Sequence, residues 1–193
     1  MAQLTRNDLY SLEKYAEIRA DFRRRVIEHK KHRRLALDAH NTLYFEDVLT
    51  VQNQIQEMLR IERIFEAAGI QEELDVYGAL IPDGSNWKAT FMIEYADEAE
   101  RKQALALMIG IEETIWMQVY GHERVYAIAN EDLDRSAPDK TASVHFLRFE
   151  LTPAMREAAK NGARLSAGID LPVCPSRLTI PETVRAALAG DLQ

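Results

Sequence analysis

Cysteine, long apolar runs and cofactor motifs are all scarce in this chain. Its one cysteine, Cys174, excludes an internal disulfide and any site built from several thiolates of one chain, and we interpret it as an inert thiol. No stretch approaches the roughly 20 apolar residues that cross a bilayer. Residues 1–7 hold no apolar leader. We therefore expect a cytoplasmic protein, away from the membrane, with no evident cofactor.

Positive charge is also scarce, except in one segment. The formal net charge is −7, yet residues 23–34 contain seven Lys or Arg and one Glu and carry +6, which leaves −13 for the rest. Such a local field attracts anions and speeds the approach of an acidic partner. Nucleic acid is not the expected partner, because the chain is acidic overall and only Phe22 stands beside the basic residues. The predicted anion- or partner-binding residues are Arg23, Arg24, Lys30, Lys31 and Arg34.

Residues 1–80 have the periodicity of helices. Thr5 and Asp8 resemble a capping pair that opens a long first helix, and Gly69 is a typical helix stop. One stripe of the first helix is largely apolar and comprises Tyr15, Ile18, Phe22, Val26 and His29. The predicted helices span 6–34, 46–68 and 71–77, with a linker over 36–44.

Residues 81–193 change to the alternation of strands. Trp87, Ala89, Phe91 and Ile93 alternate with more polar residues, and Gly121 marks a hairpin. Strands are predicted over 87–95, 114–120, 124–129, 142–151 and 165–169, helices over 97–109, 153–161 and 181–189, and a poorly ordered polar loop over 130–140. The expected fold is α+β: a single two-layer domain, 1–193, with a helical subregion 1–80 packed on a mainly antiparallel sheet of about five strands in 81–193.

One constellation suggests a divalent metal site. His29 and His32 lie three residues apart on the first helix, so both imidazoles can approach one point. The second helix would supply Glu57 and Glu62, and Glu62 falls on its apolar stripe, where a carboxylate must be neutral, paired or bound to metal.

An antiparallel helix hairpin argues against that arrangement. It would place His29 beside Glu46 or Asp47 and leave Glu62 further along. The alternative interpretation makes His29 a partly buried core residue and His32 a solvated one. Glu62 would then pair with Arg19 or Arg60.

Other polar residues have less specific patterns. His145 faces inward on its strand and would act as a general base if a carboxylate faced it, but hydrogen bonding to a backbone carbonyl is the commoner role. His122 and Glu123 occupy a hairpin tip. The basic segment also suits acidic helical residues of this chain or of a second copy, such as Glu66, Glu72, Glu73 and Asp75.

Four segments together resemble a known bacterial family. They are 45–47 (FED), 54–64 (QIQEMLRIERI), 80–95 (LIPDGSNWKATFMIEY) and 144–151 (VHFLRFEL), and they identify the chain as similar to domain of unknown function 3501 over nearly its whole length. The resemblance implies no catalytic residue. It does imply a setting, since members are often encoded beside a rubrerythrin and a heterodisulfide-reductase-like iron–sulfur protein, which suggests oxidative-stress defence or electron transfer.

Two functions from different classes remain open. The preferred hypothesis is a non-catalytic accessory protein that docks an acidic partner, such as the rubrerythrin or the iron–sulfur protein, through the basic helix. The alternative is a metal-binding protein or metal-dependent enzyme that uses His29, His32 and carboxylates of the second helix.

Overall fold

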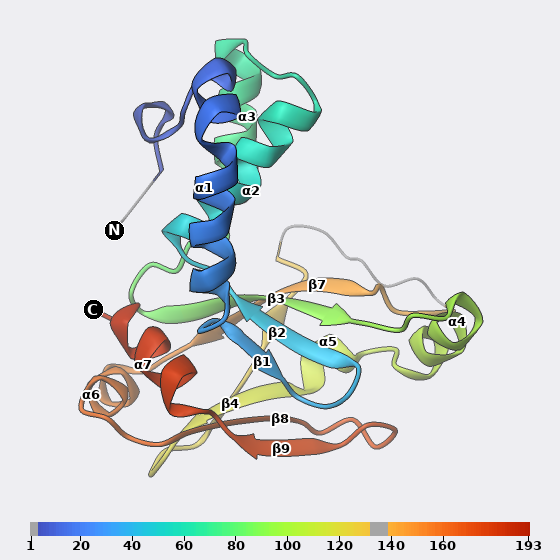
Figure 1. The fold of residues 1–193 in the computed structure, drawn as a ribbon. Helices are drawn as coiled ribbons and strands as arrows, with labels where there is room; N and C mark the ends of the chain where they lie inside the picture. Colours follow the sequence, from blue (N-terminus) through green and yellow to red (C-terminus); the bar gives the residue numbers. More distant parts are fainter. Residues whose placement is uncertain (1–3, 132–138) are drawn as a thin grey trace.

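The computed structural model describes residues 4–131 and 139–193 (Figure 1). Most of the predicted loop over 130–140 lies outside the described residues. The helices are η1 (Arg6–Asp8), α1 (Leu12–Lys30), α2 (Val48–Ile61), α3 (Ala67–Gly78), α4 (Glu98–Leu107), α5 (Ile111–Thr114), α6 (Pro153–Lys160) and α7 (Glu182–Gly190). The strands are β1 (Arg34–Ala36), β2 (Asn41–Phe45), β3 (Asn86–Ile93), β4 (Ile115–Val119), β5 (Arg124–Tyr126), β6 (Ile128–Ala129), β7 (Val144–Glu150), β8 (Leu165–Ile169) and β9 (Ser176–Thr179).

Two antiparallel sheets form the body of the protein, which confirms the predicted α+β class. One sheet has the order β1-β2-β3-β7-β6 and the other β5-β4-β8-β9. The predicted strand over 124–129 divides between them, because β5 pairs with β4 and β6 pairs with β7. In Figure 1 the sheets lie one above the other, with α6 and α7 at one end and α4 at the other.

The main hydrophobic core fills the space between the sheets. The alternation predicted for β3 is confirmed, since Trp87, Ala89, Phe91 and Ile93 are buried and the residues between them are not. Phe149 of β7 and Met117 of β4 join the same core. Each large apolar side chain buried in this way contributes about 1.5–3 kcal/mol. The indole nitrogen of Trp87 donates to the carbonyl of Leu188 at 2.9 Å, which ties α7 to the body.

A second tryptophan lies flat on the outer face of the β4 sheet. Trp116 is fully buried, since it pairs with Gly168 across the sheet and the Arg124 guanidinium covers its ring at 4.0 Å. A Cβ at position 168 would lie 2.5 Å from the Trp116 ring and 2.2 Å from the Ser176 carbonyl. Only glycine fits there.

Helices α1, α2 and α3 form an arm that rises from the outer face of the β3 sheet (Figure 1). The arm has two small cores of its own, one around Ile55 and Leu59 and one around Tyr15 and Phe22. The rings of Tyr15 and Phe22 meet edge to face, with their centroids 5.8 Å apart. The predicted apolar stripe of the first helix is therefore confirmed. That residues 1–193 form one domain stays a prediction.

The boundaries of the helical region differ from those predicted. Thr5 and Asp8 do form a capping box, but for η1, and Ser11 caps α1 instead. The prediction of a linker over 36–44 is wrong: these residues belong to a hairpin of β1 and β2, whose turn is fixed by the Asp38 carboxylate, which accepts two backbone N–H groups at 2.8 Å. The predicted helices 46–68 and 71–77 correspond to α2 and α3, but α2 ends earlier than predicted because the chain turns at Arg63, whose φ is 56°. The prediction that Gly69 stops a helix is wrong, since Gly69 lies inside α3.

Candidate functional site

The basic segment covers the outer surface of α1 and the turn that follows it. Six of its seven Lys and Arg residues, including Arg24, Arg25 and Lys31, are exposed or half-exposed, and the seventh, Arg33, is buried. Several exposed cations are held by neighbours on the same helix: Arg24 pairs with Asp21 and Lys31 with Glu28. Such exposed pairs contribute about 0–1 kcal/mol and are easily exchanged for a partner's carboxylates.

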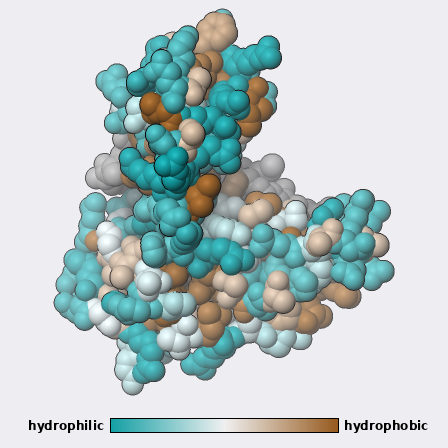
Figure 2. Space-filling model, viewed as in Figure 1, coloured by the Kyte–Doolittle hydropathy of each residue, from teal (hydrophilic) through white to brown (hydrophobic). Residues whose placement is uncertain are grey.

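Ile27 lies in the middle of this basic surface, with 56% of the residue exposed. It stands four residues from Arg23 and from Lys31, so the three side chains share one helix face. Figure 2 shows the arm as mainly hydrophilic on the side in view, with hydrophobic residues at only a few places. The sequence alone indicates that Ile27 is exposed, because it falls outside the apolar stripe that contains Phe22 and Val26.

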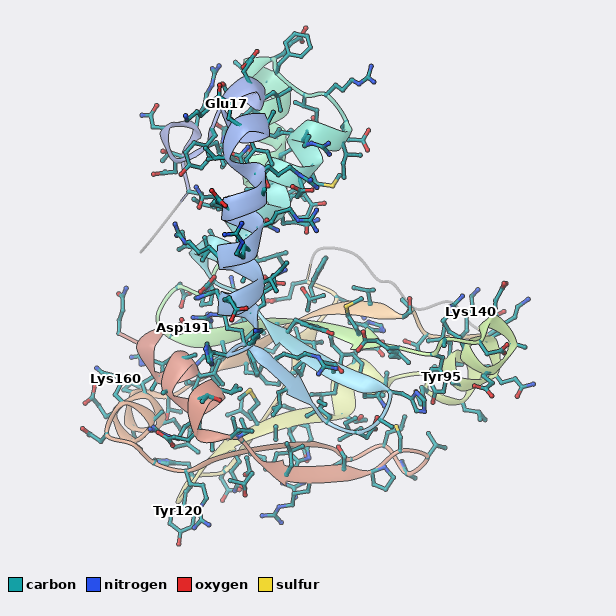
Figure 3. All side chains as sticks on the ribbon, viewed as in Figure 1. Glu17, Tyr95, Tyr120, Lys140, Lys160 and Asp191 are labelled. Atoms are coloured by element: carbon teal, nitrogen blue, oxygen red, sulfur yellow. The ribbon has the colours of Figure 1, made fainter. Side chains whose placement is uncertain are left out.

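Arg33 fastens the base of the arm to Asp191, which follows α7 and lies beside the base of the arm in Figure 3. Its guanidinium donates twice to the Asp191 carboxylate, at 2.7 and 2.9 Å, and its Nε lies 2.7 Å from Asp47 Oδ2. Burial lowers the pKa of Arg33, but the hydrogen bonds to Asp191 and the negative charges of Asp191, Asp47 and Glu46 together outweigh burial and raise it. Burial raises the pKa of Asp191 above its usual value, and Arg33 opposes that rise.

His29 belongs to the same junction. Its Nε2 lies 2.5 Å from Asp47 Oδ2 and 3.0 Å from Arg33 Nε. The prediction that an antiparallel hairpin would bring His29 beside Asp47 is confirmed. Asp47 also caps α2 by accepting the N–H of Thr50 at 2.9 Å, so the polar contacts of His29 are structural ones.

The other predicted metal ligands lie elsewhere. Glu57 accepts two bonds from Arg19 at 2.8 Å and one from the Tyr15 hydroxyl at 2.7 Å. The Arg19 bonds, against the effect of burial, lower the pKa of Glu57 to about 2. His32 is exposed. Arg19, one of the two arginines that the alternative interpretation pairs with Glu62, therefore pairs with Glu57.

The prediction that Glu62 lies on a buried stripe is wrong. Helix α2 ends at Ile61, and Glu62 is its exposed C-cap residue, since the chain turns away before the stripe reaches it. His29, His32, Glu57 and Glu62 are therefore not brought together. In the part of the chain that the structure describes, no three His, Cys, Asp or Glu side chains gather in a way that suits a metal ion.

His145 is buried against polar neighbours in the body. Its Nε2 lies 3.0 Å from the carbonyl of Ala142, as the commoner interpretation predicts, and 2.9 Å from the Thr141 hydroxyl. The Glu112 carboxylate is 3.9 Å away. At 1% exposure His145 is not open to a substrate.

Burial raises the pKa of the Cys174 thiol, which agrees with an unreactive cysteine.

His122 and Glu123 lie at the tip of the β4–β5 hairpin, as predicted. The backbone N–H of His122 donates to the Val119 carbonyl at 3.0 Å, which closes the turn. Gly121 occupies the left-handed region in that turn, with a φ of 86°. These two residues shape a turn.

Comparisons with known proteins agree with this description of the chain. A crystal structure of a novel protein of unknown function from Burkholderia pseudomallei has 50% sequence identity, covers 100% of both chains and superposes with a TM-score of 0.95. No curated protein matches. No helix in the described ranges is long and apolar enough to cross a membrane. The model of the family described as protein of unknown function DUF3501 matches residues 3–192, and the chain belongs to that family.

Proposed function

We propose that this protein is a non-catalytic accessory protein that docks an acidic protein partner through the exposed face of α1. The observation that carries the proposal is Ile27, an exposed apolar side chain between Arg23 and Lys31. Protein interfaces commonly combine an apolar anchor with a charged rim. This face lies on the C-terminal half of α1, near the base of the arm where α1 meets β1 (Figure 1).

The charges favour a protein partner over a small anion. The basic residues of α1 extend over several helical turns and are not gathered around one point, so they match a surface of carboxylates. We infer a cytoplasmic partner from the redox setting that the family resemblance implies, either the rubrerythrin or the iron–sulfur protein. A second copy of this chain is the competing occupant.

The direct test measures binding of each purified candidate partner as a function of salt. In the test variant, Arg24 and Lys31 are changed to Glu and Ile27 to Ser. We expect at least a tenfold weaker association for this variant and a wild-type affinity that falls steeply with salt. The matched control, Lys102→Glu with Lys140→Glu, reverses two exposed charges at the other end of the body and should bind as wild type does (Figure 3).

Two results would refute the proposal. One is unchanged binding in the folded triple variant. The other is the absence of binding to either candidate at low salt. Self-association that disappears in the triple variant would assign the surface to a second copy instead.

A further inference from the structure

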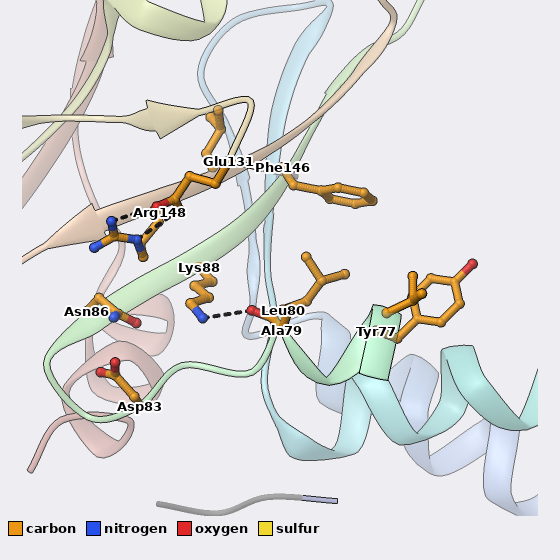
Figure 4. Close-up of a pocket in the computed structure, with 11 residues that line it drawn as sticks. Tyr77, Ala79, Leu80, Asp83, Asn86, Lys88, Glu131, Phe146 and Arg148 are labelled. Atoms are coloured by element: carbon orange, nitrogen blue, oxygen red, sulfur yellow. Dashed lines mark hydrogen bonds and ion pairs between the residues drawn. The ribbon is translucent and has the colours of Figure 1, made fainter. Parts of the chain in front are cut away.

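A groove separates the arm from the outer face of the β3 sheet (Figure 4). It encloses about 560 Å³, and a second hollow of about 390 Å³ adjoins it and shares Tyr77, Leu80 and Phe146 with it. Cavities of this size suit small molecules. The alternation of β3 explains the floor, because Lys88 and its neighbours on the same side of the strand point away from the core.

The groove has an apolar end and a polar end, with Lys88 between them. In Figure 4, Leu80 and Tyr77 lie on one side of Lys88, and Asn86 and Asp83 lie on the other. Val76 and Phe146 extend the apolar end. A ligand that fills the groove must therefore be apolar at one end and polar at the other.

Lys88 offers a hydrogen-bonding cation at the centre of the groove. Its Nζ donates to the Ala79 carbonyl at 2.7 Å, and an ammonium group has three N–H bonds. Burial lowers the pKa of Lys88, and the charge of Asp83 opposes that effect. Burial destabilises the charged form of Lys88, and a carboxylate on the ligand would stabilise that form through a charge-assisted hydrogen bond.

Asn86 carries an unsatisfied acceptor at the polar end. The residue is 1% exposed, and its Oδ1 accepts no hydrogen bond from the described residues. Its Nδ2 lies 3.4 Å from Glu150 and 3.5 Å from Ser85, and the amide also interacts with Asp83, whose pKa it helps to lower. A buried acceptor without a donor is costly and normally has a partner, so this atom indicates a ligand that supplies one.

Asp83 gives this end a negative charge. Burial raises the pKa of Asp83, but hydrogen bonds from Ser85 and Asn86 and the charge of Lys88 together outweigh burial and hold the pKa below its usual value. Asp83 is therefore ionised at neutral pH. A ligand group that donates to both Asn86 and Asp83 gains most if it is a cation.

We propose that this groove binds a small molecule that carries an amine beside a carboxylate and an apolar side chain, the class of hydrophobic α-amino acids. The carboxylate meets Lys88, the ammonium group meets Asn86 Oδ1 and Asp83, and the side chain lies against Leu80, Tyr77 and Phe146. Each ligand part faces the side chains that complement it.

Four probes separate these contributions by titration calorimetry with the full chain. L-Phenylalanine has all three parts, 3-phenylpropionate lacks the amine, phenethylamine lacks the carboxylate, and glycine lacks the apolar side chain. We expect L-phenylalanine to bind at one site with a Kd of about 1 mM or tighter, and each incomplete probe to bind at least tenfold more weakly.

Two variants locate the site. Lys88→Met should weaken L-phenylalanine at least tenfold, and Val76→Trp should block the groove from a position that is 62% exposed and tolerates a larger side chain. Lys102→Met, on an exposed surface of α4, is the control. Circular dichroism and denaturation check folding, and Val76→Trp decides the matter if Lys88→Met does not fold.

The outcomes are distinct. Loss of binding in Val76→Trp, with unchanged binding in the control, supports the site. The proposal is overturned if wild-type protein binds none of the probes, if both groove variants bind L-phenylalanine as wild type does, or if 3-phenylpropionate binds as tightly as L-phenylalanine.

Discussion

Replacing Arg33 by methionine should destabilise the protein more than any other single change on the basic segment. Arg33 is 6% exposed and is the counter-charge of two carboxylates, those of Asp47 and Asp191. Methionine retains most of the volume but leaves the Asp191 carboxylate buried without its partner. Breaking a buried ion pair from one side costs about 3–5 kcal/mol. That is a large share of the roughly 5–15 kcal/mol that stabilises a typical protein.

Urea denaturation at pH 7, monitored by circular dichroism, measures this loss directly. The matched control is Arg24→Met, which also removes one positive charge from the segment but at a side chain that is 75% exposed. We expect a change below about 0.5 kcal/mol for the control. The double variant Arg33→Met with Asp191→Leu should recover much of the loss, because it removes the stranded carboxylate as well.

The pH dependence gives a second check on the same reasoning. Because Arg33 opposes the rise in the pKa of Asp191, its removal should raise that pKa further. A carboxyl group with a raised folded pKa favours folding below its unfolded pKa and loses this advantage as pH rises through the folded pKa. The deficit of Arg33→Met should therefore be largest at neutral pH and shrink as pH falls toward about 4. Equal unfolding midpoints for Arg33→Met, Arg24→Met and wild type at pH 7 would refute the proposed role of the junction.

Two further predictions concern stability. Glu57→Gln should lower the free energy of unfolding at pH 7 by about 2 kcal/mol, after allowance for the partial exposure of Glu57. Glu62→Gln, at an exposed position, should lower it by less than about 0.5 kcal/mol. The folded pKa of Glu57 is depressed to about 2, so the cost of Glu57→Gln should be complete above pH 4.5 and vanish as pH falls toward 2; an equal cost for Glu62→Gln in urea denaturation would contradict the arrangement of α2. Gly168→Ala should cost several kcal/mol, on the order of 3, because its Cβ meets Trp116 and the Ser176 carbonyl. Gly78→Ala at the end of α3, where nothing lies within 4 Å, should be neutral or stabilise by up to about 1 kcal/mol, and similar thermal midpoints for both alanine variants would contradict this packing.

The sequence predicts the strands with a strong alternation and misses those without one. Strands β3 and β7 bury every second residue, so their period of two is visible in the residues themselves. Strand β2 is buried on both sides along most of its length and shows no alternation. Strand β1 alternates, but over only three residues, which is too short a pattern to predict a strand. The sequence places the break between the second and third helices at Gly69, but the chain turns earlier, at Arg63, which adopts the left-handed conformation although no proline or glycine marks the position.

Local geometry also decides how much of the site is predictable. The contact between His29 and Asp47 follows from an antiparallel hairpin, and the sequence predicts it. The contact between Arg33 and Asp191 joins residues 158 positions apart, and no pattern within one sequence indicates it. Glu57 lies within α2, whereas Glu62 lies just beyond its end. Where α2 ends depends on the packing of α3 against it, so residue type alone does not distinguish the two glutamates.

The 158 positions between Arg33 and Asp191 place the fastening of the arm late in synthesis, long after the arm itself is made. Chains are made at about 5–20 residues per second, so roughly 8–30 s pass between the synthesis of Arg33 and that of its partner 158 residues later. The arm has cores of its own and can gather its helices while the sheets are still being made. During that interval Arg33 lacks its Asp191 counter-charge, and the surface between arm and sheets stays open to water. A nascent chain that has not yet reached Asp191 lacks the contact that fastens the arm, so the arm and the sheets become fixed to each other only after both have been made.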